Sequence, residues 1–169
     1  MSLQLDGTNG VLGNSGAFIA GTAVASTSGT SIDFTSIPSW VKRVTVMFSG
    51  VSTNGTSYFQ IQIGSGSPTT TGYVSSVAYS GTAEQGYSAT TGFLVVAGNG
   101  ATDAYNGIIT LATLGSNTWV SQGSLSRGDG YNWASSARVS IGGTLDRVRI
   151  TTVNGTDTFD AGSINILYE

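Results

Sequence analysis

The sequence of 169 residues contains no histidine and no cysteine. Serine and cysteine nucleophiles are most often activated by a histidine, and this chain cannot supply one. Without cysteine there are no disulfides and no zinc sites built on thiolates, and no Asp-rich loop offers the several oxygens that calcium needs. We therefore predict a protein that is not an enzyme, with no catalytic residue, no cofactor and no metal site.

Charged residues make up only 9% of the chain, against roughly 25% in ordinary soluble domains. The net charge is −3, and the nearest thing to a basic cluster is Arg147 with Arg149. A nucleic-acid partner is excluded because such a partner requires a basic surface that neutralises phosphates. A β protein with so few charges aggregates easily through open sheet edges. The composition therefore favours a homo-oligomer in which edges are closed or covered.

Long hydrophobic runs are also missing. No stretch approaches the roughly 18 apolar residues of a membrane span, so we expect no membrane insertion. The first residues show neither the basic segment nor the apolar segment of a signal peptide, and we expect a protein that is not secreted by that route.

Glycine, in contrast, is abundant, with 25 residues that punctuate the whole chain together with serine, threonine and asparagine. Between these turn signals lie about nine or ten short segments in which apolar and polar residues alternate, as in half-buried strands. No convincing helix and no internal repeat is visible. We predict an all-β fold: a single-domain antiparallel β-sandwich of jelly-roll type over residues 17–169. Residues 1–16 form an N-terminal arm that is flexible or orders on docking.

The most informative stretch contains two alternating segments, residues 43–49 and 58–63. The loop between them includes Asn54–Gly55, a pair that readily adopts the positive φ of tight turns. Gln60 and Gln62 share the polar face of the second segment. We interpret this unit as a β-hairpin with one apolar face.

Further along, the pattern predicts polar loops at residues 81–91 and 98–106 and a tight turn at residues 127–130. An early strand is expected within residues 18–24. Trp40 and Trp133 are expected in the core or at an interface.

The stretch TSIDFTSIPSWVKRVTVMFSGVSTNGTS, residues 30–57, resembles a module of bacteriophage tail fibres and other virion structural proteins. Residues 158–169 resemble the closing strand of that module. The resemblance covers about residues 21–66 and 147–169 and transfers no catalytic set. It implies a component of the phage particle, in the tail rather than the capsid, assembled in the host cytoplasm. It also implies a homotrimer that docks to other virion proteins through its N-terminal arm.

Several tyrosines lie in or beside loops that also carry charged and amide side chains. Sugar-binding surfaces stack such rings on C–H faces and bind hydroxyls with carboxylates, amides and guanidinium groups, and binding sites concentrate on loops. The predicted glycan-binding residues are Tyr87, Asp103, Tyr105, Arg127, Asp129, Tyr131 and Asn132. The alternative for each ring is an ordinary place in the core or in an oligomer interface.

Three functions follow as hypotheses. The first is a tail fibre or receptor-binding protein that recognises a bacterial surface polysaccharide or another receptor. The second is a structural virion protein, either a capsid decoration (cement) protein or a baseplate component. The third is a small polysaccharide depolymerase, which needs two facing carboxylates; the candidates are Glu84, Asp103 and Asp129. Their alternative role is that of turn residues that bind nearby backbone groups.

Overall fold

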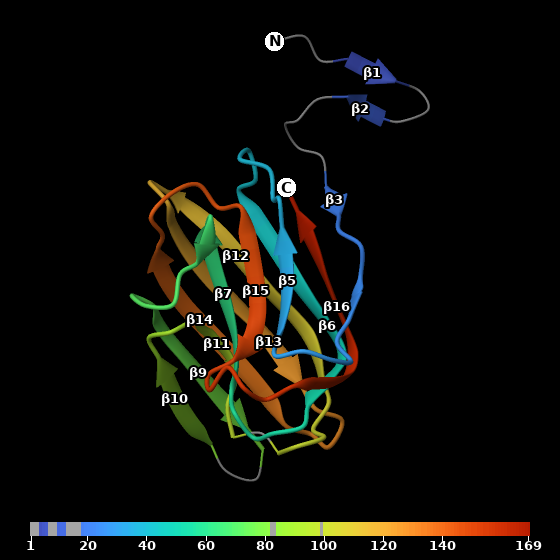
Figure 1. The fold of residues 1–169 in the computed structure, drawn as a ribbon, viewed down its shortest axis with the longest axis vertical. Coiled ribbons are helices and arrows are strands. Elements are labelled where there is room, and N and C mark those ends of the chain that lie inside the picture. The colour runs from blue at the N-terminus through green and yellow to red at the C-terminus, as the bar shows by residue number, and fades with distance from the viewer. Residues whose placement is uncertain (1–3, 7–9, 13–17, 82–83, 99) are drawn as a thin grey trace.

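The computed structural model describes residues 4–6, 10–12, 18–81, 84–98 and 100–169. This described part is all-β and contains no helix, so none of it could cross a membrane as a helix. Two antiparallel sheets pack face to face (Figure 1). The predicted β-sandwich is therefore confirmed, whereas its jelly-roll type stays a prediction.

Within the described part of the chain, the larger sheet has nine strands. In spatial order they are β10 (Gln85–Ala89), β9 (Val74–Ser80), β14 (Asn132–Ser140), β13 (Thr118–Ser126), β12 (Tyr105–Gly115), β6 (Arg43–Thr53) and β16 (Phe159–Tyr168), with β3 (Ile19–Ala20) and β4 (Val24–Ala25) both paired to β16.

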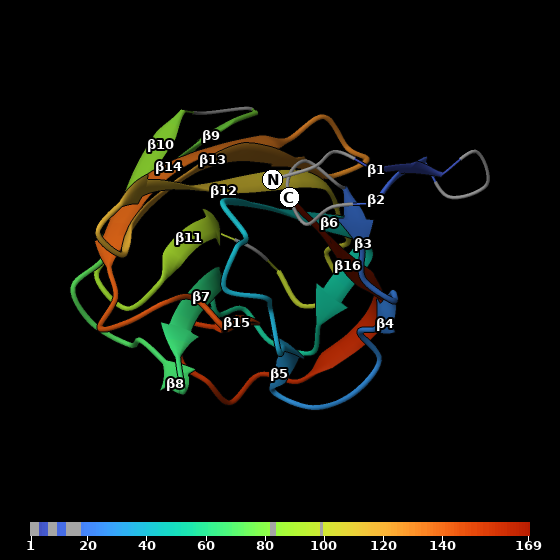
Figure 2. The same ribbon diagram turned by 90° about the horizontal axis from the view of Figure 1, so that it is seen from above.

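The smaller sheet has five strands among the residues that the structure describes. They are β11 (Phe93–Val96), β7 (Phe59–Ser65), β15 (Arg147–Thr152) and β5 (Ser31–Thr35), with β8 (Ser67–Pro68) paired to β7. Figure 2 shows the two layers, with β12, β13 and β14 lying over β11, β7 and β15.

The core fills the space between the layers. Because successive side chains of a strand point to opposite faces, each strand contributes every second residue. Phe59 of β7 packs edge-to-face against Tyr105 of β12 and Phe159 of β16, with ring centroids 5.3 and 5.9 Å apart. All three rings are buried, and their contacts join β7 of the smaller sheet to β12 and β16 of the larger sheet.

The predicted hairpin of residues 43–49 and 58–63 is wrong in its pairing. The two segments are strands, but β6 pairs with β12 and β16 while β7 pairs with β11 and β15. Residues 54–58 therefore cross from one sheet to the other. Gly55 allows a close approach there, because a Cβ at this position would displace the carboxylate of Asp157.

The predicted loop at residues 81–91 is also partly wrong, since residues 85–89 form β10 and pair with β9. This strand lies at the edge of the larger sheet and most of its residues are exposed. Its composition is therefore polar and glycine-containing, and the apolar alternation is too weak to recognise. The single early strand expected within residues 18–24 is instead two short pairings, β3 and β4, along β16.

Within the predicted arm, β1 (Gln4–Asp6) pairs with β2 (Gly10–Leu12). This pair lies beyond one end of the sandwich (Figure 1). The rest of the arm falls outside the described residues, and its docking role stays a prediction.

Candidate functional site

Several loops meet at one end of the sandwich, which we call the Arg127 end. Here β9 ends at Ser80, β12 begins at Tyr105, β13 ends at Ser126 and β14 begins at Asn132. Because these strands are neighbours in one antiparallel sheet, the connections at their ends lie together.

Arg127 lies at the centre of this end and binds two carboxylates. Its Nε and Nη2 donate to Asp129 over 2.9 and 2.7 Å, and its Nη1 pairs with Asp103. Two parallel bonds to one carboxylate are the strongest geometry available to arginine. The hydrogen bonds to Asp129 raise the pKa of Arg127, and in return Arg127 lowers the pKa of Asp129. Both groups therefore stay charged.

The Arg127–Asp129 pair sits in the turn between β13 and β14. The amide of Gly130 donates to the carbonyl of Arg127 over 3.3 Å, and the amide of Arg127 donates to Tyr131 over 3.0 Å. Gly130 has a φ of 95°, which disfavours residues with a side chain. The tight turn predicted at residues 127–130 is confirmed.

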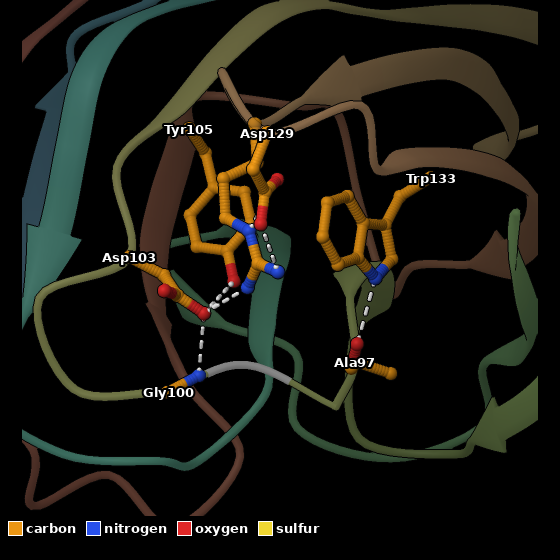
Figure 3. A network of polar contacts seen from close by, with 7 residues as sticks. Ala97, Gly100, Asp103, Tyr105, Asp129 and Trp133 are labelled. Carbon is orange, nitrogen blue, oxygen red and sulfur yellow. Dashed lines mark hydrogen bonds and ion pairs between the residues drawn. The ribbon is translucent and has the colours of Figure 1, made fainter. Parts of the chain in front are cut away.

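Asp103 lies between β11 and β12 and binds two described neighbours, Gly100 and Tyr105. Its Oδ2 accepts from the amide of Gly100 over 2.7 Å and from the Tyr105 hydroxyl over 3.4 Å (Figure 3). At the other end of the same loop, the indole Nε1 of Trp133 donates to the carbonyl of Ala97 over 2.6 Å. Arg127 thus links Asp103, which lies between β11 and β12, to Asp129, which lies in the turn between β13 and β14.

Aromatic rings surround the guanidinium. The Cζ of Arg127 lies 4.5 Å from the ring centroid of Tyr131 and 5.6 Å from that of Trp133. These distances suit cation–π attraction. The rings of Tyr131 and Trp133 stack with an interplanar angle of 28°.

From Tyr131 a line of partly exposed rings continues across the end of the sandwich. Tyr131 neighbours Tyr79 at 6.0 Å, Tyr79 stacks with Tyr87 at 6.2 Å, and Tyr87 meets Tyr58 at 5.2 Å between centroids. We call Tyr58, Tyr87, Tyr79 and Tyr131 the tyrosine row. Burial raises the pKa of Tyr79, and the neighbouring phenols of Tyr87 and Tyr131 add to the effect.

The structure brings most of the predicted glycan-binding residues together. Asp103, Arg127, Asp129 and Tyr131 are in direct contact, and Tyr87 joins them through Tyr79. Asn132 follows directly in sequence and is exposed at the start of β14.

Tyr105 needs correction as a ligand contact. Its side chain is 0% exposed, and burial raises the pKa of its hydroxyl. It can support Asp103 from beneath but cannot reach a ligand.

Sequence reasoning missed two members of the tyrosine row, Tyr58 and Tyr79. Tyr58 precedes β7 in the connection that crosses between the sheets, and Tyr79 follows Val77 on the inward face of β9. The only sequence signal was that both are tyrosines at the ends of strands.

The arrangement suits binding of a polar ligand. It offers flat ring faces, and the side chain of Asp129 is 52% exposed and able to accept hydrogen bonds from hydroxyl groups. Among the described residues, no group of three or more acidic side chains is placed to hold a metal ion.

No protein-family model and no curated protein matches the chain. One solved structure, "Structure of infectious bursal disease virus Gx strain", aligns with 99% of this chain and 43% of that chain at 12% identity, with a TM-score of 0.15. The chain thus spans less than half the length of that protein, and a similarity this low carries no argument.

Proposed function

We propose that this chain is a bacteriophage virion protein, a tail fibre or receptor-binding component, whose Arg127 end binds a bacterial surface glycan. The phage assignment follows from the resemblance of residues 30–57 and 158–169 to virion modules. The site assignment follows from one observation: Arg127 contacts both an exposed carboxylate, that of Asp129, and Tyr131, the first of a row of half-exposed rings at the same end of the sandwich.

Pre-organisation supports glycan binding at this end. Arg127 holds the carboxylates of Asp103 and Asp129 at the same time, so these two side chains need little further ordering when a ligand arrives. Ring faces of the tyrosine row can stack on the C–H faces of sugar rings. The oxygens of Asp129 can accept hydrogen bonds from sugar hydroxyls beside those rings.

Binding without hydrolysis is the better interpretation of the carboxylates. A glycosidase needs one carboxyl group whose raised pKa lets it act as a general acid. Here Arg127 lowers the pKa of Asp129 instead, and it also pairs with Asp103. The two acids therefore share one cation rather than flanking a substrate.

A second candidate function is a purely structural one, as a capsid decoration or baseplate protein. The observation that favours it is the low charge of five adjoining strands, β10, β9, β14, β13 and β12, which contain one charged residue, Arg138. Depletion of charge is typical of the centre of protein interfaces. The same surface supports the proposed homotrimer, while attachment to other virion proteins is assigned to the N-terminal arm.

The test is binding of the purified protein to surface polysaccharides from a panel of bacteria, measured by biolayer interferometry. We expect Tyr131→Ala and Asp129→Asn to weaken binding at least 10-fold while the melting temperature confirms folding. The matched control is Asp146→Asn, which alters a partly exposed aspartate paired with Arg147, outside the Arg127 end. Equal binding by all variants would remove the site, and no binding to any polysaccharide would leave the structural function as the better proposal.

A further inference from the structure

A second polar feature lies on the outer face of the smaller sheet. It is a hollow of about 300 Å³ between β7, β15 and the segments beside them. We call it the polar groove and define it by Gln60, Gln62, Thr91, Arg149, Thr151 and Asn154.

The floor of the polar groove is a regular cross-strand array. In the register of β7 and β15, Gln62 lies opposite Arg149 and Gln60 lies opposite Thr151. Since these positions alternate with the core residues Ile61 and Ile150, their side chains share the outer face. Strands, rather than loops, therefore set the positions of these side chains.

The two glutamines are unusually buried for an outer face. Gln60 is 2% exposed and Gln62 is 6% exposed. Burial of an amide is costly unless hydrogen bonds compensate it. Thr91 provides them: its hydroxyl donates to Gln60 Oε1 over 2.8 Å, and its carbonyl accepts from Gln62 Nε2 over 2.9 Å. The amides are thus held in fixed orientations.

One donor and one acceptor remain available on neighbouring strands. Arg149 uses Nε and Nη2 to bind Asp33 over 2.7 and 3.1 Å. Among the described residues, neither Nη1 of Arg149 nor Oε1 of Gln62 has a hydrogen-bond partner in the protein. Asp33 neutralises Arg149, so the groove offers hydrogen bonds without net charge.

We propose that the polar groove is a second ligand site that binds a neutral saccharide of one or two rings. Sugar hydroxyls donate and accept at once, which matches an amide oxygen beside a guanidinium nitrogen. The hollow is at the lower end of the roughly 300–1,000 Å³ of ligand sites, which limits the ligand to a small unit. An anion is disfavoured because Arg149, the one cation among the described residues that line the groove, is already paired with Asp33. This site is independent of the glycan site proposed at the Arg127 end.

The test is an NMR titration of the ¹⁵N-labelled protein with glucose, galactose, mannose, rhamnose and N-acetylglucosamine. We expect at least one sugar to shift the side-chain amide signals of Gln60 and Gln62 in a saturable way. Gln62→Ala and Arg149→Lys should each weaken this binding at least 10-fold. Arg149→Lys keeps the charge on a partly exposed side chain, so it remains informative if Gln62→Ala fails to fold.

The matched control is Gln122→Ala, which alters an exposed glutamine of β13 in the other sheet. It should leave the titration unchanged. The proposal is overturned if no sugar shifts the two glutamines, or if the shifts are confined to the Arg127 end. If no sugar shifts the groove signals but Tyr131→Ala abolishes polysaccharide binding, the function proposed for the Arg127 end is supported and the groove site is not.

Discussion

The guanidinium carbon of Arg127 lies 4.5 Å from the centroid of the Tyr131 ring. This contact joins the charged centre of the Arg127 end to the tyrosine row. The side chain of Arg127 is 19% exposed, so solvent screens its interactions only in part. Arg127 thus stabilises the carboxylates of Asp103 and Asp129 and also contacts the Tyr131 ring of the candidate site.

Replacement of Arg127 with alanine should destabilise the fold. It leaves Asp103 and Asp129 without their shared cation and removes the cation–π contact, and we expect a loss of about 2 kcal/mol in the free energy of unfolding. Arg43→Ala is the control, because the side chain of Arg43 is 48% exposed and pairs with a single carboxylate, that of Glu169, and it should cost about 0–1 kcal/mol. Urea denaturation measures both values; equal losses would show that Arg127 has no special role.

Acid should destabilise the fold through two arginine-paired carboxylates, Asp129 at the Arg127 end and Asp146 outside it. Hydrogen bonds from Arg127 and Arg147 lower the pKa values of Asp129 and Asp146 in the folded protein below the ordinary 3.8. Each charged carboxylate therefore contributes stability that is present above pH 3.8 and is lost as the pH falls through its folded pKa. The urea midpoint should drop below about pH 4. The double variant Asp129→Asn/Asp146→Asn should show a smaller fall in urea midpoint below pH 4 than the wild-type protein. An equal fall would show that these two carboxylates do not cause it.

The hydroxyl of Tyr73 should be structurally important. It accepts from the amide of Ile63 over 2.9 Å and donates to the carbonyl of Thr69 over 3.1 Å. Tyr73→Phe leaves the buried amide without its partner and should cost about 1–2 kcal/mol. Tyr168→Phe, at a ring that packs on Trp40, should cost less than half as much. Thermal and urea denaturation compare the two variants, and similar stabilities would contradict the prediction.

Tyr73 also predicts an alkaline limit to stability. Burial raises its pKa to about 12 from the ordinary 10.0, so its contribution is complete below pH 10 and is lost as the pH rises towards 12. Ultraviolet titration should show that Tyr73 ionises only near pH 12 or on unfolding, and that Tyr105 and Tyr79, whose pKa values are also raised, ionise above pH 10. Ionisation of all tyrosines near pH 10 in the folded protein would contradict this.

The low-charge face of the larger sheet should mediate self-association. A trimer has a mass of about 52 kDa, three times the 17.2 kDa of one chain, and light scattering after size exclusion measures it directly. Ser136→Glu places a carboxylate in the middle of this face and should give monomers, because removing a charge from water inside an interface is costly. Thr35→Glu, on β5 of the smaller sheet, is the control and should leave the oligomer intact. A monomeric wild-type protein would contradict the proposal.

The sequence predicted the strands better than their partners. Alternation in residues 131–141 located β14 to within a residue at either end, because burial of every second side chain is a local property. Pairing is not local: the segments that form β6 and β7 resemble a hairpin, yet they lie in different sheets. The alternation of apolar and polar residues indicates which side chains of a strand face the core, but it does not indicate which other strand pairs with it.

In the candidate site, too, local contacts could be predicted from the sequence and long-range contacts could not. The contact between Arg127 and Asp129 spans one turn and could be anticipated from the sequence, whereas Asp103 reaches Arg127 only through the pairing of β12 with β13. Tyr58 and Tyr79 joined the tyrosine row through packing of the two sheets. Burial separated Tyr105 from the other tyrosines, and no local pattern signals that difference.

The most direct test of the central claim is electron microscopy of phage particles that contain this protein, labelled with a gold-conjugated antibody against it. The expected result is label at the distal end of the tail, where a receptor-binding protein acts. Label over the capsid would contradict the tail assignment and favour a decoration protein. An absence of label on every particle would contradict the virion assignment itself.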